Sequence, residues 1–185
     1  MKNPKLAGRY ANALFTFSIE QNQLEKVYQD VTLINTVFKE NRELRAVIES
    51  PVIFPAQKNH IFTELLQNRL SDITFGFLRL MIAKKREPAL TGICEAFVEL
   101  YYQHHNIKIA QIITAQPLTD TLTDNLKQLL ETQTGSKIII QPVINPDLIG
   151  GLLVKIDNFV VDASIQAKIN RLKAQFSQNI YKAGF

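Results

Sequence analysis

The sequence predicts a mainly helical protein with a small α+β part. We expect a six-helix bundle over residues 1–105, followed by a domain over residues 106–185 with a short β-sheet and two helices. In the first part, apolar residues recur at intervals of three and four, which is the spacing of amphipathic helices. After Asn106 the apolar residues alternate in short β-branched runs, which is typical of strands.

The first helix, which starts at Pro4, is apolar over more than the single face that a surface helix needs. One stripe consists of Leu6, Tyr10, Ala13 and Phe17. A second stripe of mostly small residues consists of Ala7, Ala11, Leu14 and Ser18. Small side chains allow another helix to approach closely, so this second stripe is a candidate contact.

The fifth helix, ITFGFLRLMIAKKR, is capped by Ser71 or Asp72 and also carries two stripes. One consists of Ile73, Phe77 and Leu80, and the other of Phe75, Leu78 and Ile82. Either the helix is central and buried on all sides, or one stripe packs in the bundle while the other meets a partner chain. The spacing favours neither alternative.

The last third of the chain holds the most specific pattern. We expect strands over 107–113 and 137–144, the second at a sheet edge because of Pro142. A hairpin turns at Asp157-Asn158 between strands 152–156 and 159–162. Gly150-Gly151 indicates a bulge or a close backbone approach, and the bulge is the favoured interpretation. Asp162 or Ser164 caps a last helix, which we expect to close the domain with Ile165, Ile169, Leu172 and Phe176.

Composition and motifs argue against several function classes. The net charge is +4, but residues 1–105 carry 13 basic and 11 acidic side chains and residues 106–185 carry 8 and 6, so no basic arm signals nucleic acid. Neither a membrane span nor a signal peptide is evident. The pair His104-His105 with Glu99 lacks the convergent ligands of a metal site, and the single Cys94 suits a packing role. We expect no catalytic residue, cofactor or metal.

These features resemble the delta subunit family of F-type ATP synthases, called the oligomycin-sensitivity-conferring protein in mitochondria. The resemblance spans essentially the whole chain. It rests on Arg9-Tyr10-Ala11 and Ala13-Leu14, on Ser50-Pro51 before a helix containing Lys58, and on Ile149-Gly150-Gly151-Leu152 leading into Val154-Lys155-Ile156 and Asp162-Ala163-Ser164-Ile165. Glycine is common in the family at the position of Ala163, a difference that concerns local turn geometry.

The resemblance implies a mechanical role as a peripheral-stalk subunit. The family's N-terminal domain binds the N-terminal segments of the alpha subunits through its first and fifth helices, and its C-terminal domain binds the C-terminal ends of the b subunits. The alpha-subunit contact would therefore involve stripes singled out above. As a hypothesis we assign it to Ala7, Ala11, Leu14, Phe75, Leu78 and Ile82, with Arg9, Tyr10, Gly150, Gly151 and Asp162 as structural motif residues.

The resemblance also implies one copy per complex, which meets the membrane only indirectly through that complex. Because no transit peptide is evident, we expect the cytoplasmic face of a bacterial inner membrane. The alternative function is a basic two-domain nucleic-acid-binding or adaptor protein, against which the even distribution of charge argues.

Overall fold

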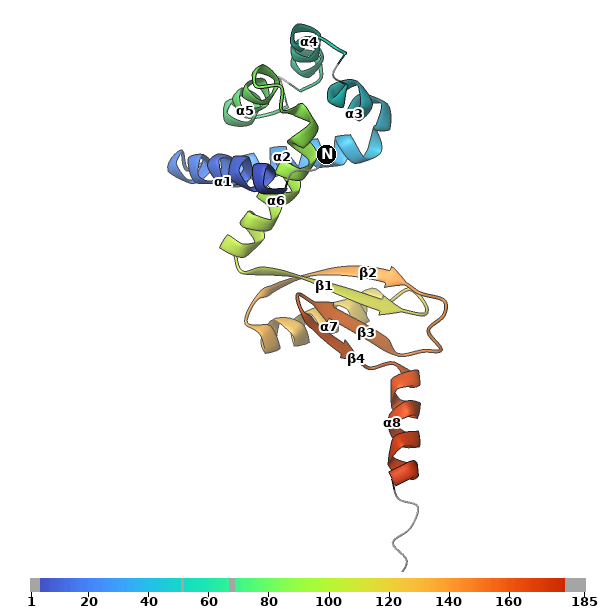
Figure 1. Ribbon diagram of the computed structural model, residues 1–185. Coiled ribbons are helices and arrows are strands. Elements are labelled where there is room, and N and C mark those ends of the chain that lie inside the picture. The colour runs from blue at the N-terminus through green and yellow to red at the C-terminus, as the bar shows by residue number, and fades with distance from the viewer. Residues whose placement is uncertain (1–3, 51, 67–68, 179–185) are drawn as a thin grey trace, which may run out of the picture. The chain divides into compact units, whose positions relative to one another are not determined.

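The computed structural model describes residues 4–50, 52–66 and 69–178. The chain divides into two compact units, Met1–His105 and Asn106–Phe185. The described residues are mainly helical with one small four-stranded mixed sheet (Figure 1), which confirms the predicted class at that level.

Unit 1 is built from helices around one core. Its elements are α1 (Pro4–Glu20), α2 (Leu24–Glu40), α3 (Arg42–Glu49), α4 (Pro55–Leu66), α5 (Asp72–Ala83), the 3₁₀ turn η1 (Glu87–Ala89) and α6 (Leu90–His104). Helix α6 packs against both α1 and α2, and its Ile93 and Phe97 are fully buried. Ser50 ends α3 in an extended conformation, while Pro51 of the Ser50-Pro51 motif lies outside the described residues.

Unit 2 is a sheet with one face covered by a helix. Its elements are β1 (Ile107–Thr114), α7 (Asp120–Thr134), β2 (Lys137–Ile144), β3 (Leu152–Ile156), β4 (Phe159–Asp162) and α8 (Ile165–Gln178). The strand order is β2-β1-β3-β4, with β1 and β2 parallel and the other pairs antiparallel. Pro142 lies on the edge strand β2, as predicted. Leu130 of α7 packs into a core with Ala110 and Ile138.

The turns of unit 2 follow the predicted chemistry. Gly135 ends α7 in the left-handed conformation with φ 62°, which glycine adopts without a steric penalty. Asp157 has φ 50°, and Ile156 pairs with Phe159, so the two-residue hairpin is confirmed. Ser164 is the cap of α8, because its Oγ accepts a hydrogen bond from the N–H of Ala167 at 3.2 Å.

Gly150 and Gly151 precede β3 and lie outside its ladder, so the favoured bulge interpretation is wrong. They permit the backbone to approach the start of α8. A Cβ on Gly151, whose φ is +80°, would lie 2.5 Å from the carbonyl oxygen of Ala163. The N–H of Ile165 donates to the Gly150 oxygen at 3.0 Å. The double glycine therefore sets where α8 leaves the sheet.

The apolar face of α8 is exposed. Leu172 is 52% and Phe176 is 72% exposed, and Ile165 and Ile169 are also accessible. The prediction that this helix closes the domain is wrong for the described residues, since its periodicity gives an apolar face but not the surface that covers it. In Figure 1, α8 extends away from the strands of its unit.

Candidate docking surface

Helix α1 uses its small-residue stripe to pack inside unit 1. Ala7, Ala11 and Leu14 are all buried, and α6 crosses over this stripe. At the crossing, a Cβ on Gly92 of α6 would lie 3.5 Å from the Cβ of Ala7. The small side chains thus allow a close contact within the chain, and they are not accessible to a partner.

Helix α5 buries the stripe that the contact hypothesis selected. Leu78 is 1% exposed and Ile82 is fully buried, and Phe75 is half-buried against the same core. Leu14 and Leu78 line one small internal void. Of the six residues assigned to the alpha-subunit contact, five are therefore core residues. This assignment is corrected here, because side chains buried in the chain's own core cannot form a docking surface in this conformation.

The other stripes of α1 and α5 are the accessible ones. Tyr10 of α1 meets Phe77 of α5 in an edge-on ring contact, with centroids 6.5 Å apart. Phe17 is 47% and Leu80 is 46% exposed. We call this surface the α1/α5 face, and it consists of Leu6, Tyr10, Ala13, Phe17, Ile73, Phe77 and Leu80. It consists of one apolar stripe from each helix, and an aromatic pair joins the two stripes.

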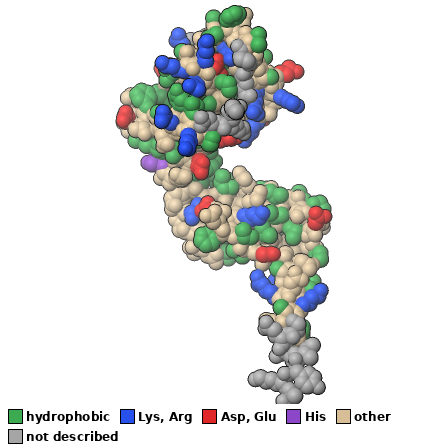
Figure 2. Space-filling view, in the orientation of Figure 1, with side chains coloured by type: hydrophobic (Ala, Val, Ile, Leu, Met, Phe, Trp, Pro, Cys, Tyr) green, Lys and Arg blue, Asp and Glu red, His purple; other side chains and the backbone are tan. Residues whose placement is uncertain are grey.

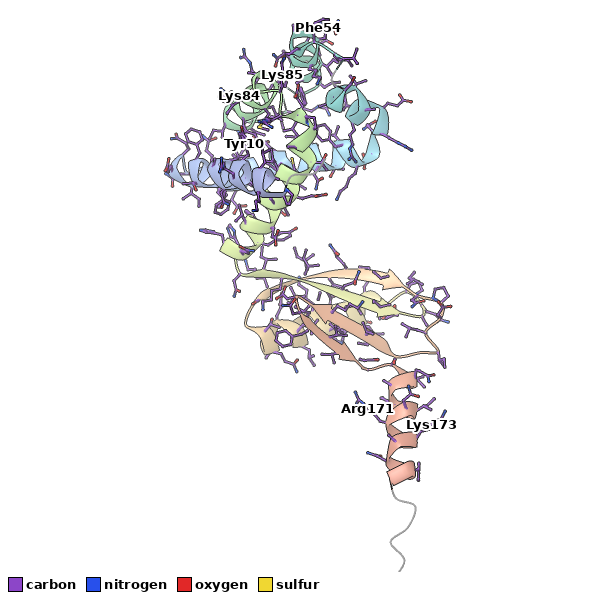
Figure 3. The ribbon with its side chains drawn as sticks, viewed as in Figure 1. Tyr10, Phe54, Lys84, Lys85, Arg171 and Lys173 are labelled. Carbon is purple, nitrogen blue, oxygen red and sulfur yellow. The ribbon has the colours of Figure 1, made fainter. Side chains whose placement is uncertain are left out.

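Positive charge borders the α1/α5 face. Arg9 is exposed beside Tyr10, and Lys84 follows Leu80 at helical spacing at the end of α5. Figure 3 labels Tyr10 and Lys84 on these two helices. Figure 2 shows hydrophobic side chains beside Lys and Arg side chains on the surface of unit 1. This surface therefore suits an amphipathic segment that carries some acidic side chains.

A buried carboxylate fixes the start of α5. The Oδ2 of Asp30 on α2 accepts hydrogen bonds from the N–H of Ser71 at 2.8 Å and from its Oγ at 2.5 Å. The Ser71 Oγ in turn accepts a hydrogen bond from the N–H of Thr74. Of the two predicted caps, Ser71 is therefore the N-cap of α5, and Asp72 is not. Asp30 is 41 residues from Ser71, and sequence periodicity gave no signal of this link.

A second buried polar link joins α4 to η1. The Nζ of Lys58 lies 3.0 Å from the Oε1 of Glu87, and both side chains are 4% exposed. Ions that are removed from water are stable only when they are paired. This pair therefore fixes the position of α4 relative to the turn before α6. Lys58 is part of the motif noted in the sequence, but its partner was not predicted.

An aromatic cluster lies at the carboxyl end of α6. Tyr101 stacks on Tyr28 with ring centroids 3.7 Å apart, and its hydroxyl donates to both carboxylate oxygens of Glu25. Burial, and then the hydrogen bond to Glu25, raise the pKa of Tyr101 to about 12. The Nε2 of His105 lies 3.3 Å from the same carboxylate. The cluster holds α2 and α6 together.

In unit 2, β4 and α8 carry a group of accessible apolar side chains. Phe159, Val160 and Val161 of β4 are all exposed, on an edge strand with one free side. We call this region, together with Ile165, Ile169, Leu172 and Phe176, the β4/α8 surface. Arg171 and Lys173 extend from α8 (Figure 3). Directly before α8, hydrogen bonds from the hydroxyl of Ser164, and then from its N–H, lower the pKa of Asp162.

The described residues offer little for chemistry. They contain no group of three or more His, Cys, Asp or Glu side chains that could hold a metal ion. Burial raises the pKa of the Cys94 thiol to about 12, which makes it a packing residue and not a nucleophile. None of the helices that the structure describes is both long and apolar enough to cross a membrane. The α1/α5 face and the β4/α8 surface are the candidate docking surfaces.

Comparison with known proteins identifies the family. The model of the family described as "ATP synthase delta (OSCP) subunit" matches residues 6–176. The chain belongs to this family. ATP synthase subunit delta of Salinibacter ruber is 35% identical over 100% of both chains. The subunit of the same name from Cytophaga hutchinsonii is 31% identical over 97% of this chain and 98% of its own length.

A solved structure agrees with this membership of the delta (OSCP) family. A chain in the cryo-EM structure of the Toxoplasma gondii mitochondrial ATP synthase hexamer has a TM-score of 0.71 and 26% identity to this chain. The match covers 93% of this chain and 97% of that chain. The resemblance noted from Arg9-Tyr10 and Gly150-Gly151 is confirmed, and the family's fold extends over both units.

Proposed function

We propose that this chain is a non-catalytic stator subunit of an F-type ATP synthase, which links the catalytic head to the membrane sector through the peripheral stalk. Each of its two units exposes an organised apolar helical surface, and this observation carries the proposal. A protein that joins two partners needs two separate surfaces, and large apolar patches on soluble proteins mark interaction sites. Family membership along the whole chain supports the same role.

Unit 1, the predicted six-helix bundle, binds the N-terminal segments of the alpha subunits on its α1/α5 face. This face consists of a helical strip that is open to solvent along both Phe17 and Leu80, and it is bordered by Arg9 and Lys84. An amphipathic helix can place its apolar side on such a strip and its acidic side chains against the basic rim. The contact thus uses the other stripe of each helix, not the one that the contact hypothesis from the sequence selected.

Unit 2 binds the C-terminal ends of the b subunits on its β4/α8 surface. The exposed face of α8 repeats at helical spacing, so another helix can pack along it. Arg171 and Lys173 flank this face and can pair with acidic residues of the stalk. The edge strand β4 adds Phe159 and Val161 beside the root of α8.

The mechanism is mechanical. The chain holds the ring of alpha and beta subunits to the stalk while the rotor turns, so that torque drives ATP synthesis. It needs no catalytic residue, cofactor or metal. We place one copy in each complex at the cytoplasmic face of a bacterial inner membrane, where the chain meets the membrane only through the complex.

The test is a binding measurement with an N-terminal peptide of the alpha subunit and the full chain. Leu80→Asp and Phe17→Asp each place a carboxylate on a half-exposed apolar position of the α1/α5 face. Burying the leucine at an interface contributes about 1 kcal/mol or more, and burying an unpaired carboxylate costs more than that. We expect affinity to fall by about tenfold or more, since 1.4 kcal/mol is a factor of ten.

Leu122→Asp is the matched control, because Leu122 of α7 is equally exposed, at 51%, but belongs to unit 2. It should leave the affinity for the peptide unchanged. Leu78→Asp would be uninformative, since a carboxylate at this core position disrupts the fold. Wild-type affinity in both Leu80→Asp and Phe17→Asp would contradict the assignment of the α1/α5 face.

A further inference from the structure

Unit 1 also carries a pocket close to the end of α5. The segment between α3 and α4 and the turn between α5 and α6 enclose a pocket of about 260 Å³. The pocket is lined by Val52, Ile53, Phe54, Pro55, Lys58, Lys85, Glu87 and Pro88. Small-molecule sites have volumes of about 300–1,000 Å³. This smaller, open pocket suits a side chain of a partner better than a cofactor.

The rim of the pocket carries apolar side chains that the unit itself does not cover. Val52 is 82% and Phe54 is 72% exposed, and these two residues are close neighbours in sequence. Pro55 and Pro88 make the walls stiff, because proline fixes φ. The pocket therefore combines apolar side chains at its rim with stiff proline walls, and it can accept an aliphatic or aromatic side chain.

The charge at the rim is positive. Inside the pocket, Lys58 and Glu87 neutralise each other through their 3.0 Å contact. Lys85 remains, with Lys84 and Arg86 beside it in the sequence. Within the part of the chain that the structure describes, the Lys85 ammonium has no hydrogen-bonded or ionic partner. An occupant of the pocket therefore meets an unneutralised cation at its edge.

The backbone of Lys85 supports a role for its side chain outside this unit. Lys85 has φ 54°, the left-handed conformation that glycine adopts most easily at the end of a helix. Its N–H donates to the oxygen of Ile82, and the N–H of Arg86 donates to that of Met81, both at 2.9 Å. A lysine here costs free energy that glycine would not, and among the described residues no hydrogen bond or ion pair of its ammonium offsets this cost.

We propose that this pocket is a second contact between unit 1 and the catalytic head, and that it takes an apolar side chain flanked by a carboxylate from an acidic segment of the head. The proposal rests on the proposed function. The apolar walls select the anchor side chain, and Lys85 pairs with the neighbouring carboxylate. Because the rim is cationic, we expect the segment that binds there to be acidic.

The pocket also continues the surface already assigned to the head. Lys84 ends the helical stripe of Ile73, Phe77 and Leu80, and the next residue, Lys85, lines the pocket. Figure 3 labels Tyr10, Lys84, Lys85 and Phe54 on unit 1. A partner that occupies the α1/α5 face is therefore within reach of the pocket.

The experiment measures the affinity of the full chain for the purified cognate catalytic head. Phe54→Ser and Lys85→Glu should each weaken binding by about tenfold. Lys85→Gly should weaken it similarly while raising or preserving the denaturation midpoint, because glycine fits the left-handed backbone. Lys39→Glu, a charge reversal at an exposed site on α2, is the control and should leave the affinity within twofold of wild type.

Hydrogen exchange gives a second measurement that does not depend on variants. In the wild-type complex with the head, residues 52–58 and 84–88 should become protected from hydrogen exchange, in addition to residues of α1 and α5. If Phe54→Ser and Lys85→Gly bind normally and these segments gain no protection, while Leu80→Asp weakens binding, the pocket proposal is wrong and the proposed function stands. If Leu80→Asp and Phe17→Asp also bind normally, the assignment of the α1/α5 face fails as well.

Discussion

Removing one partner of the buried pair of Lys58 and Glu87 should strongly destabilise unit 1. Lys58→Met keeps the length of the side chain but removes its charge, so the carboxylate of Glu87 stays buried without a partner. At the observed 3.0 Å, the attraction that is lost is about 5 kcal/mol for an effective dielectric constant near 20. Breaking one side of a buried pair costs about 3–5 kcal/mol in other proteins. The two estimates agree.

The double variant Lys58→Met/Glu87→Leu distinguishes the cost of an unpaired buried charge from the cost of altered packing. It removes both charges and should recover most of the loss, to within about 1 kcal/mol of wild type, because apolar replacements of a buried ion pair are close to neutral. The assay is urea unfolding followed by tyrosine fluorescence. Four of the five tyrosines belong to residues 1–105, and the chain has no tryptophan, so the signal reports mainly on unit 1.

A loss of 3–5 kcal/mol is a large share of the 5–15 kcal/mol that stabilises a typical domain. With a slope of about 1–3 kcal/mol per molar urea, the midpoint should fall by more than 1 M. The reasoning is refuted if Lys58→Met unfolds within about 1 kcal/mol of wild type. It is also refuted if the double variant is as unstable as the single one, since the cost would then come from packing and not from the unpaired charge.

Three further predictions concern other parts of the chain. Gly151→Ala should destabilise unit 2 by more than about 2 kcal/mol in thermal unfolding, because its Cβ meets the Ala163 oxygen. The control is Gly135→Ala, which has φ 62° but open space around the added Cβ and should cost only about 1–2 kcal/mol. Equal losses would contradict the close approach at Gly151. The pKa of Tyr101 is raised from 10.0 to about 12, so its contribution to stability is complete below pH 10 and is lost as the pH rises through about 12. An alkaline titration at 295 nm in which every tyrosine ionises near pH 10 would refute the raised pKa. Leu172→Asp should weaken binding of the C-terminal part of the b subunit by about tenfold and leave binding of the alpha peptide unchanged; an unaltered b affinity would remove α8 from the contact.

Local patterns predicted most of the elements, because helix and strand periods and capping chemistry are properties of short segments. Pro142 marks a sheet edge and Asp157-Asn158 marks a turn through the backbone conformations open to them, and both are where the sequence places them. Contacts between distant residues were not predictable in this way. The Asp30 carboxylate accepts a hydrogen bond from Ser71, which lies 41 residues away in the sequence. Lys58 pairs with Glu87, which lies 29 residues away.

The docking residues illustrate the same limit. Helices α1 and α5 are each apolar on two sides, so periodicity found both stripes but could not tell which one faces the core. That choice depends on a crossing with α6, where Gly92 lies against Ala7 from 85 residues away. On α8 the sequence predicted an apolar face correctly, but not that it would be left exposed, because the partner for that face is not part of the chain.

The proposed function requires that this chain join two partners that do not otherwise bind each other. The decisive experiment immobilises the soluble C-terminal part of the b subunit and measures how much catalytic head is retained with and without the chain. We predict that the head is retained only when the chain is present, and that retention is lost in both Leu80→Asp and Leu172→Asp. Retention of the head without the chain, or no retention with the wild-type chain, would refute the proposed function.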